Sequence, residues 1–168
     1  MTNVLYQHGT LGTLMAGLLK GTASISEILE HGDLGIATLT GSNGEVIFVD
    51  GKAYHANEYK EFVELKGDEL TPYATVTKFT ADTTYQTKDK SSEDVFEEIK
   101  KNMLSENLFS AVKISGKFKN MHVRMMPGQE PPYTRLIDSA RRQPEQTETY
   151  VKGTVVGFFT PCLLYTSD

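Results

Sequence analysis

The sequence predicts an α+β fold in which a mostly antiparallel or mixed β-sheet carries three or four short helices. Three observations lead to this prediction. Short runs rich in β-branched and aromatic residues alternate with turn residues along much of the chain. Apolar residues recur at helical spacing in a few short segments. The turn Gly41–Gly44 contains Asn-Gly between the apolar runs Ile36–Leu39 and Val46–Val49, which is the strongest short-range signal for a β-hairpin.

Two short helices are expected before this hairpin. Apolar residues recur at helical spacing within Leu11–Leu19, although the glycines inside this run weaken a helix. The second helix follows Ser24, which forms a capping box with Glu27 three residues later. Gly32 stands where a left-handed C-terminal cap would end that helix.

Strands and one longer helix are expected after the hairpin. The predicted strands are Lys52–Ala56, Glu61–Leu65, Ala74–Phe79 and Thr83–Thr87. The period then changes, because Ser91 and Asp94 form a second capping box ahead of apolar residues at helical spacing up to Met103. This segment is the clearest helix in the sequence.

The last third of the chain returns to strands. Two alternating runs, Ser110–Ile114 and Met121–Met126, are expected to be joined by a connection over Gly116–Asn120. Side chains alternate faces along a strand, so Arg124 is predicted to point away from the apolar face formed by Met121, Val123 and Met125.

A short helix, a loop and a final strand complete the prediction. Leu136, Ile137 and Ala140 indicate a helix that stops before Pro144. The polar run Gln143–Thr149 is interpreted as a surface loop, and Lys152–Thr160 as a strand.

Composition limits the classes of function. The chain has 168 residues, 39% of them hydrophobic, which is enough for one core of ordinary size. Its net charge of −5 offers no field that would attract nucleic acid. No apolar run approaches the roughly 20 residues of a membrane span, so we expect no membrane partner and a cytoplasmic location. The single cysteine, Cys162, gives no support for a disulfide.

The residues alone leave the chemistry open. His8, His31, His55 and His122 are scattered and have no spacing typical of a zinc site. No nucleophile–histidine arrangement and no phosphate-binding loop can be identified. Glu45, at the start of the second hairpin strand, is either a solvated charge or a carboxyl group that projects from the sheet into a site.

A series of short motifs, taken together and in order, resembles the α-acetolactate decarboxylase family. The resemblance covers about residues 8–161. It is carried by Gly32–Thr38, Asn43-Gly44-Glu45, Asp50-Gly51 with Tyr54, Thr71-Pro72-Tyr73-Ala74, Asn107-Leu108-Phe109, Gly116 with Phe118, the Arg124 strand, Pro131-Pro132-Tyr133 and Gly153–Pro161.

This resemblance implies a zinc-dependent lyase that converts 2-acetolactate to acetoin and carbon dioxide, on the route to butanediol. The family's active-site glutamate falls on Glu45, its active-site arginine on Arg124, and a threonine near the substrate on Thr38. Glu45 would exchange a proton with the enediolate, and Arg124 would offer two parallel donors to the substrate carboxylate. The resemblance also implies a two-domain fold and a possible homodimer of the full-length form.

The sequence departs from the family after Pro161. The family continues through three histidines that hold zinc and a second glutamate, whereas this chain ends with Cys162–Asp168, which resembles none of it. We therefore expect a truncated, inactive chain with no bound zinc, and we assign no metal ligand. The predicted organisation is an N-terminal sheet domain over 1–142, the start of an incomplete second β-domain over 143–161, and a non-native tail over 162–168. The alternative is a non-catalytic binding or interaction domain on the same scaffold.

Overall fold

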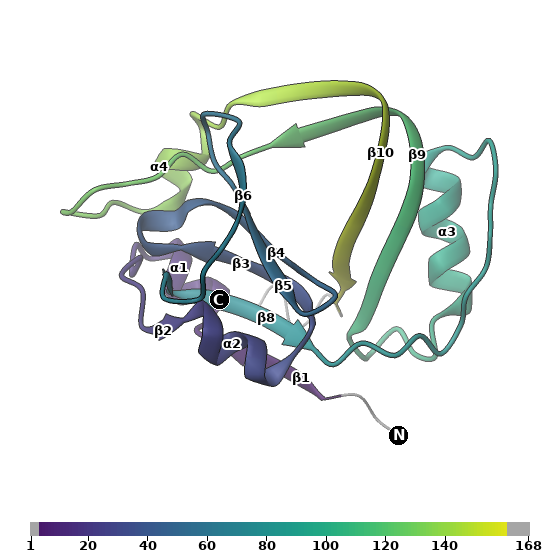
Figure 1. The fold of residues 1–168 in the computed structure, drawn as a ribbon, viewed down its shortest axis with the longest axis horizontal. Helices are drawn as coiled ribbons and strands as arrows, with labels where there is room; N and C mark the ends of the chain where they lie inside the picture. Colours follow the sequence, from purple (N-terminus) through teal and green to yellow (C-terminus); the bar gives the residue numbers. More distant parts are fainter. Residues whose placement is uncertain (1–3, 161–168) are drawn as a thin grey trace.

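The fold is built on one six-stranded antiparallel sheet and one long β-hairpin (Figure 1). The computed structural model describes residues 4–160. The sheet has the order β1-β8-β3-β4-β5-β6. Its strands are β1 (Leu5–His8), β3 (Leu34–Leu39), β4 (Asn43–Val49), β5 (Lys52–Ala56), β6 (Phe62–Glu64) and β8 (Tyr73–Thr77). A small two-stranded sheet pairs β2 (Ala23–Ser24) with β7 (Leu70–Thr71).

Four α-helices and one 3₁₀ turn are present in the described part of the chain. They are α1 (Leu11–Met15), α2 (Ile25–His31), η1 (Thr40–Ser42), α3 (Ser92–Asn102) and α4 (Leu136–Ala140). Both predicted capping boxes, Ser24 with Glu27 and Ser91 with Asp94, begin their helices as expected. The α+β fold class, mostly antiparallel with short helices, is confirmed.

The main core lies between α2 and one face of the sheet. Ile25 and Ile28 of α2 pack against Val46, Phe48 and Val76, and each of these side chains is at most 1% exposed. Full burial of such side chains contributes about 1.5–3 kcal/mol each. The core therefore fixes β3, β4 and β8 against one another and leaves their opposite face for other elements.

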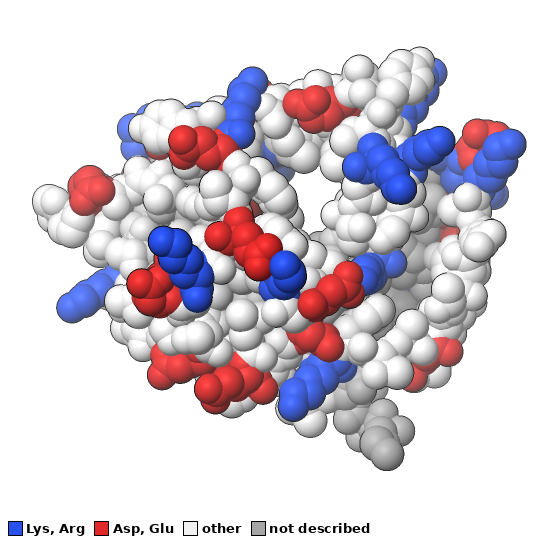
Figure 2. All heavy atoms as spheres, viewed as in Figure 1, with Lys and Arg blue, Asp and Glu red and all other residues white. Residues whose placement is uncertain are grey.

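A long hairpin arches over that opposite face. It consists of β9 (Ser110–Arg124) and β10 (Glu145–Phe159), which pair with each other along nearly their whole length. Lys113 of β9 forms an ion pair with Asp50, in the turn between β4 and β5, with 2.5 Å between Nζ and Oδ1. Figure 2 shows acidic and basic side chains interspersed on this side of the molecule, and an opening between the hairpin and the sheet.

Two predicted helix ends and one predicted strand were wrong. The first helix stops at Met15, since Gly17 adopts a φ of +90°, and does not extend to Leu19. Gly32 is extended, with a φ of −170°, and does not adopt a left-handed cap. Glycine is needed here because the backbone passes close to β8: a Cβ on Gly32 would lie 2.6 Å from the backbone nitrogen of Thr77. Thr83–Thr87 lies in an exposed irregular segment and not in a strand.

The connections predicted around the hairpin were also wrong. Gly116–Asn120 lies inside the continuous strand β9, and most of the polar run Gln143–Thr149 belongs to β10. Polar residues are compatible with strand structure here because much of the hairpin is exposed, whereas the sequence criteria assumed one buried face. The domain boundary at residue 142 stays a prediction; β10, beyond it, pairs with β9. The predicted tail 162–168 and Cys162 lie outside the described residues.

Candidate functional site

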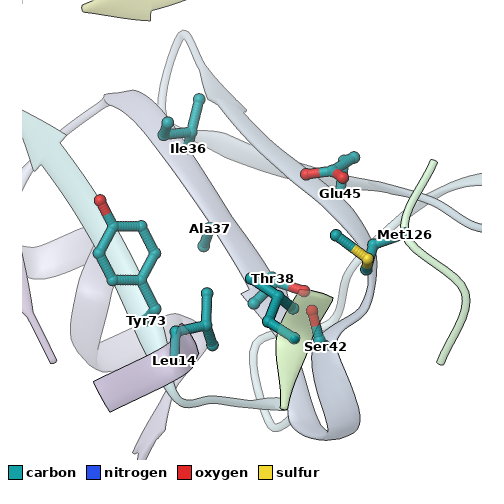
Figure 3. A pocket seen from close by; sticks show the side chains of 9 residues that line it. Leu14, Ile36, Ala37, Thr38, Ser42, Glu45, Tyr73 and Met126 are labelled. Carbon is teal, nitrogen blue, oxygen red and sulfur yellow. The ribbon is translucent and has the colours of Figure 1, made fainter. Parts of the chain in front are cut away.

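A cavity of about 170 Å³ opens on the face of the sheet that does not contact α2 (Figure 3). Its polar lining comes from Thr38, Ser42, Glu45 and Tyr73. The apolar lining residues are Leu14, Ile36, Ala37, Met126 and Leu136. Figure 3 shows Glu45 and Met126 on one side of the cavity, with Leu14 and Tyr73 facing them from the other. Strands β3, β4 and β8, helices α1 and α4, and the segment after β9 thus all contribute to one cavity.

Glu45 projects into this cavity because of its place in β4. Val46 and Phe48 point into the core with α2, and side chains alternate along a strand, so Glu45 takes the opposite face. Burial raises the pKa of the Glu45 carboxyl above its ordinary value, while a hydrogen bond from the Met126 backbone acts in the opposite direction. The protonated form is therefore favoured to a higher pH than in water, which suits a group that donates and accepts a proton.

Thr38 lies beside Glu45 and is almost fully buried, with 6% of its surface exposed. Its hydroxyl donates a hydrogen bond to the carbonyl oxygen of Gly44 at 2.8 Å. A hydroxyl has one donor hydrogen, so the Thr38 oxygen has only acceptor capacity left. In the cavity, Thr38 can therefore accept a hydrogen bond from a hydroxyl group of a ligand.

Arg124 lies at the end of β9 and is exposed. The predicted alternation is confirmed, since Met121, Val123 and Met125 are each less exposed than His122 and Arg124. The lining of the cavity includes Met126 but not Arg124, which precedes it by two residues. The structure therefore brings Glu45 and Thr38 together, and the role of Arg124 stays a prediction.

Sequence reasoning missed most of the cavity lining. Leu14 and Leu136 were assigned only to short helices, and Tyr73 was named only in the motif Thr71-Pro72-Tyr73-Ala74 of the family resemblance. The pairing of Tyr73 with Thr38 in the antiparallel register of β8 and β3 puts these residues side by side. That signal needs the strand order β8-β3-β4, which no local pattern contains.

Zinc, the metal that the resemblance implies, normally takes three or four nitrogen, sulfur or oxygen ligands from the protein. Within residues 4–160, no three His, Cys, Asp or Glu side chains gather as a metal site. His55, on the strand next to Glu45, already uses its Nε2 in a contact of 2.9 Å with the carbonyl oxygen of Asn43. The described residues therefore do not fit a zinc site by themselves.

A second cavity, of about 360 Å³, is lined in part by α1 and the segment that follows it. Gly9, Thr13, Leu18, Lys20 and Tyr133 are among its lining residues. Its ionisable lining groups are the Lys20 amine and the Tyr133 phenol, and no carboxyl group or imidazole lines it. We therefore take the cavity with Glu45 as the candidate site.

No helix in the described residues is both long and apolar enough to cross a membrane.

Comparison with known proteins finds relatives along most of the chain. The chain is 47% identical to alpha-acetolactate decarboxylase of Lactococcus lactis subsp. lactis strain IL1403 over 158 residues, which cover 94% of the chain. It is 35% identical to alpha-acetolactate decarboxylase of Bacillus subtilis strain 168 over 158 residues, again 94% of the chain. It spans 66% of the length of the first relative and 62% of the second.

Solved structures of the same kind superpose closely. A protein of unknown function from Staphylococcus aureus, described as similar to alpha-acetolactate decarboxylase, matches with a TM-score of 0.94 and 73% identity. That match covers 96% of this chain and 69% of the other. The alpha-acetolactate decarboxylase of Bacillus subtilis strain 168 matches with a TM-score of 0.90 and 34% identity, over 95% of this chain and 68% of the other.

The family model for alpha-acetolactate decarboxylase matches residues 5–166. The match begins before residue 8 and runs past Pro161, so it extends beyond both ends of the resemblance found in the sequence. Because it includes almost the whole chain, the chain belongs to the alpha-acetolactate decarboxylase family.

Proposed function

We propose that this chain provides the proton-transfer and substrate-contacting part of a site that decarboxylates 2-acetolactate to acetoin. The observation that carries this proposal is the shared cavity of Glu45 and Thr38, which is smaller than the roughly 300–1,000 Å³ of pockets for drug-sized ligands. Relatives of this chain bear the name alpha-acetolactate decarboxylase. A small hydroxy-keto acid is the class of ligand that suits these dimensions.

The reaction needs a proton donor beside the carbon that loses carbon dioxide. When the bond to the carboxylate breaks, its electron pair stays on the substrate as an enediolate. A protonated Glu45 can transfer its proton to that carbon, which gives acetoin, and regain a proton from solvent afterwards. The raised pKa of the Glu45 carboxyl supports this role, because the group then carries a proton at higher pH.

Thr38 and the apolar lining would orient the substrate. The Thr38 oxygen can accept a hydrogen bond from the substrate hydroxyl, since its own hydrogen is directed to Gly44. Ile36, Leu14 and Leu136 offer apolar surface to the two methyl groups of 2-acetolactate. We propose that Arg124 binds the substrate carboxylate, as the resemblance implies; its place just before Met126 supports this role.

We propose further that residues 1–168 do not complete the reaction by themselves. The chain spans about two thirds of the length of its Lactococcus lactis relative, and zinc does not fit the described residues alone. The homodimer, the cytoplasmic location and zinc dependence stay predictions.

Binding of a non-reacting analogue tests this function without requiring turnover. In 2,3-dihydroxy-2-methylbutanoate the keto group of 2-acetolactate is reduced, so the compound keeps the hydroxyl and carboxylate. Titration into the labelled 168-residue chain, followed by NMR, should shift the signals of Thr38 and Glu45 first. Glu148→Gln, on the exposed part of β10, is the control and should leave binding unchanged. Shifts confined to residues of the second cavity, such as Thr13 and Tyr133, would contradict the assignment.

A further inference from the structure

The backbone of Asn43 and Gly44, where the hairpin turn passes into β4, is fixed by contacts from three separate segments. The carbonyl oxygen of Gly44 accepts from the Thr38 hydroxyl at 2.8 Å, and the Gly44 N–H donates to the carbonyl oxygen of Met126 at 3.0 Å. The carbonyl oxygen of Asn43 lies 2.9 Å from Nε2 of His55. The Asn43 carbonyl, the Gly44 N–H and the Gly44 carbonyl, which precede Glu45, therefore each have a defined partner.

His55 is the ionisable member of this set, and it lies on the other face of the sheet from Glu45. It belongs to β5, pairs with Val46 in the register with β4, and is 7% exposed. A carbonyl oxygen only accepts hydrogen bonds, so Nε2 of His55 must carry the hydrogen in its contact with Asn43. The contact thus fixes the tautomer of the neutral imidazole as well as the position of the Asn43 carbonyl.

The imidazole also packs tightly against the turn. Gly44 has a φ of +66°, and a Cβ at this position would lie 2.6 Å from Nε2 of His55 and 2.2 Å from the carbonyl oxygen of Ala56. Only glycine fits such a conformation at such a distance. Any side chain at position 44 would therefore collide with His55 and with the backbone of β5.

We propose that His55 is a positioning residue for Glu45, because its hydrogen bond to the Asn43 carbonyl holds the turn from which the Glu45 side chain enters the cavity. His55 does not line the cavity, so it acts through the backbone and not on a ligand. The functional value of this arrangement rests on the proposed function, in which Glu45 transfers the proton. The geometric claim itself does not depend on catalysis.

The test measures the titration of the Glu45 carboxyl carbon by NMR in the complete 168-residue chain. His55→Leu removes the donor, and His55→Gln keeps an N–H donor at about the reach of Nε2. With leucine, we expect water to reach the loosened carboxyl group, so that the pKa of Glu45 falls towards the ordinary glutamate value. With glutamine, the raised pKa of Glu45 should be retained. His31→Leu is the control, since it makes the same change at an exposed histidine at the end of α2, whose ring stacks on Tyr6; neither of these residues lines the cavity.

Two results would overturn the proposal. The first is a folded His55→Leu chain in which Glu45 titrates as in the unchanged chain. The second is a neutral His55 in the unchanged chain that carries its hydrogen on Nδ1, which ring nitrogen shifts report even when His55→Leu fails to fold. Neither readout needs substrate. If the analogue fails to bind but His55→Leu lowers the pKa of Glu45 as expected, the proposed function is contradicted and the positioning role of His55 is not.

Discussion

The hydroxyl of Thr38 donates a hydrogen bond of 2.8 Å to the carbonyl oxygen of Gly44, the residue that directly precedes Glu45. This contact crosses the tip of the β3–β4 hairpin and joins Thr38, which lines the cavity, to the peptide group that precedes Glu45. The hydroxyl therefore has a structural role in the hairpin as well as the proposed contact with substrate.

Thr38→Val should destabilise the chain. Valine keeps the shape of threonine but removes the donor, so the carbonyl oxygen of Gly44 loses a partner inside the protein. Loss of one partner of a buried hydrogen bond costs about 1–3 kcal/mol. Urea unfolding measures the change in the free energy of unfolding. Thr87→Val, in the exposed segment before α3, is the control and should cost less than about 0.5 kcal/mol. Equal stabilities of the two variants would show that the Thr38 contact contributes nothing.

Glu45→Gln should remove a pH dependence of stability. Burial raises the pKa of the folded Glu45 carboxyl, so the folded state holds its proton more tightly than the unfolded state does. This stabilisation is fully present below the unfolded pKa and is lost as pH rises through the folded pKa. Glutamine mimics the protonated carboxyl and does not titrate. The variant should therefore gain stability over the unchanged chain as pH increases through that window, measured by urea unfolding at several pH values. A constant difference at every pH would contradict the raised pKa.

The ion pair between Lys113 and Asp50 should contribute weakly to the docking of the hairpin. It joins β9 to the turn after β4, and the Asp50 side chain is 76% exposed, so solvent and salt screen it. Lys113→Ala is expected to cost about 0.2–1 kcal/mol at low salt and less at 1 M salt. Lys117→Ala, at an exposed position of the same strand, is the control. A salt-independent loss would mean that the Lys113 stem packs against the sheet and that its charge is irrelevant.

Zinc should not bind tightly to the 168-residue chain. The described residues contain no cluster of three potential ligands, and the four histidines lie in different elements. Isothermal titration with zinc alone should give no stoichiometric binding. Stoichiometric binding that is lost when any one of His8, His31, His55 or His122 is changed would overturn this prediction.

Local chemistry explains which parts of the fold could be predicted from the sequence. The capping boxes of Ser24 and Ser91 depend on residues within a few positions, and both formed where expected. The predicted hairpin also formed, but its turn is η1 and Asn43 and Gly44 belong to β4. The prediction of a connection over Gly116–Asn120 was wrong because this segment pairs, as part of β9, with residues that follow much later in the chain. The prediction of a left-handed cap at Gly32 was wrong because the conformation of Gly32 is set by its approach to Thr77, in a strand that is distant in sequence.

Some residues of the candidate site could also be predicted from the sequence, and others could not. Glu45 and Thr38 could be nominated through the family resemblance, and the structure brings them into one cavity. The lining residues Leu14, Tyr73 and Leu136 come from elements whose proximity depends on the tertiary fold. His55 could not be nominated either, because its contact with Asn43 depends on the register between β4 and β5.

Acetoin formation tests the central role of Glu45 most directly. A chimera can join residues 1–160 to the remaining third of the Lactococcus lactis relative, with which the chain shares 47% identity. Proton transfer by a positioned side chain contributes about 10²–10⁴-fold, so Glu45→Gln should lower kcat at least about 100-fold. Glu148→Gln, on the exposed hairpin, should leave kcat unchanged. Unchanged acetoin formation by a folded Glu45→Gln chimera would contradict the account.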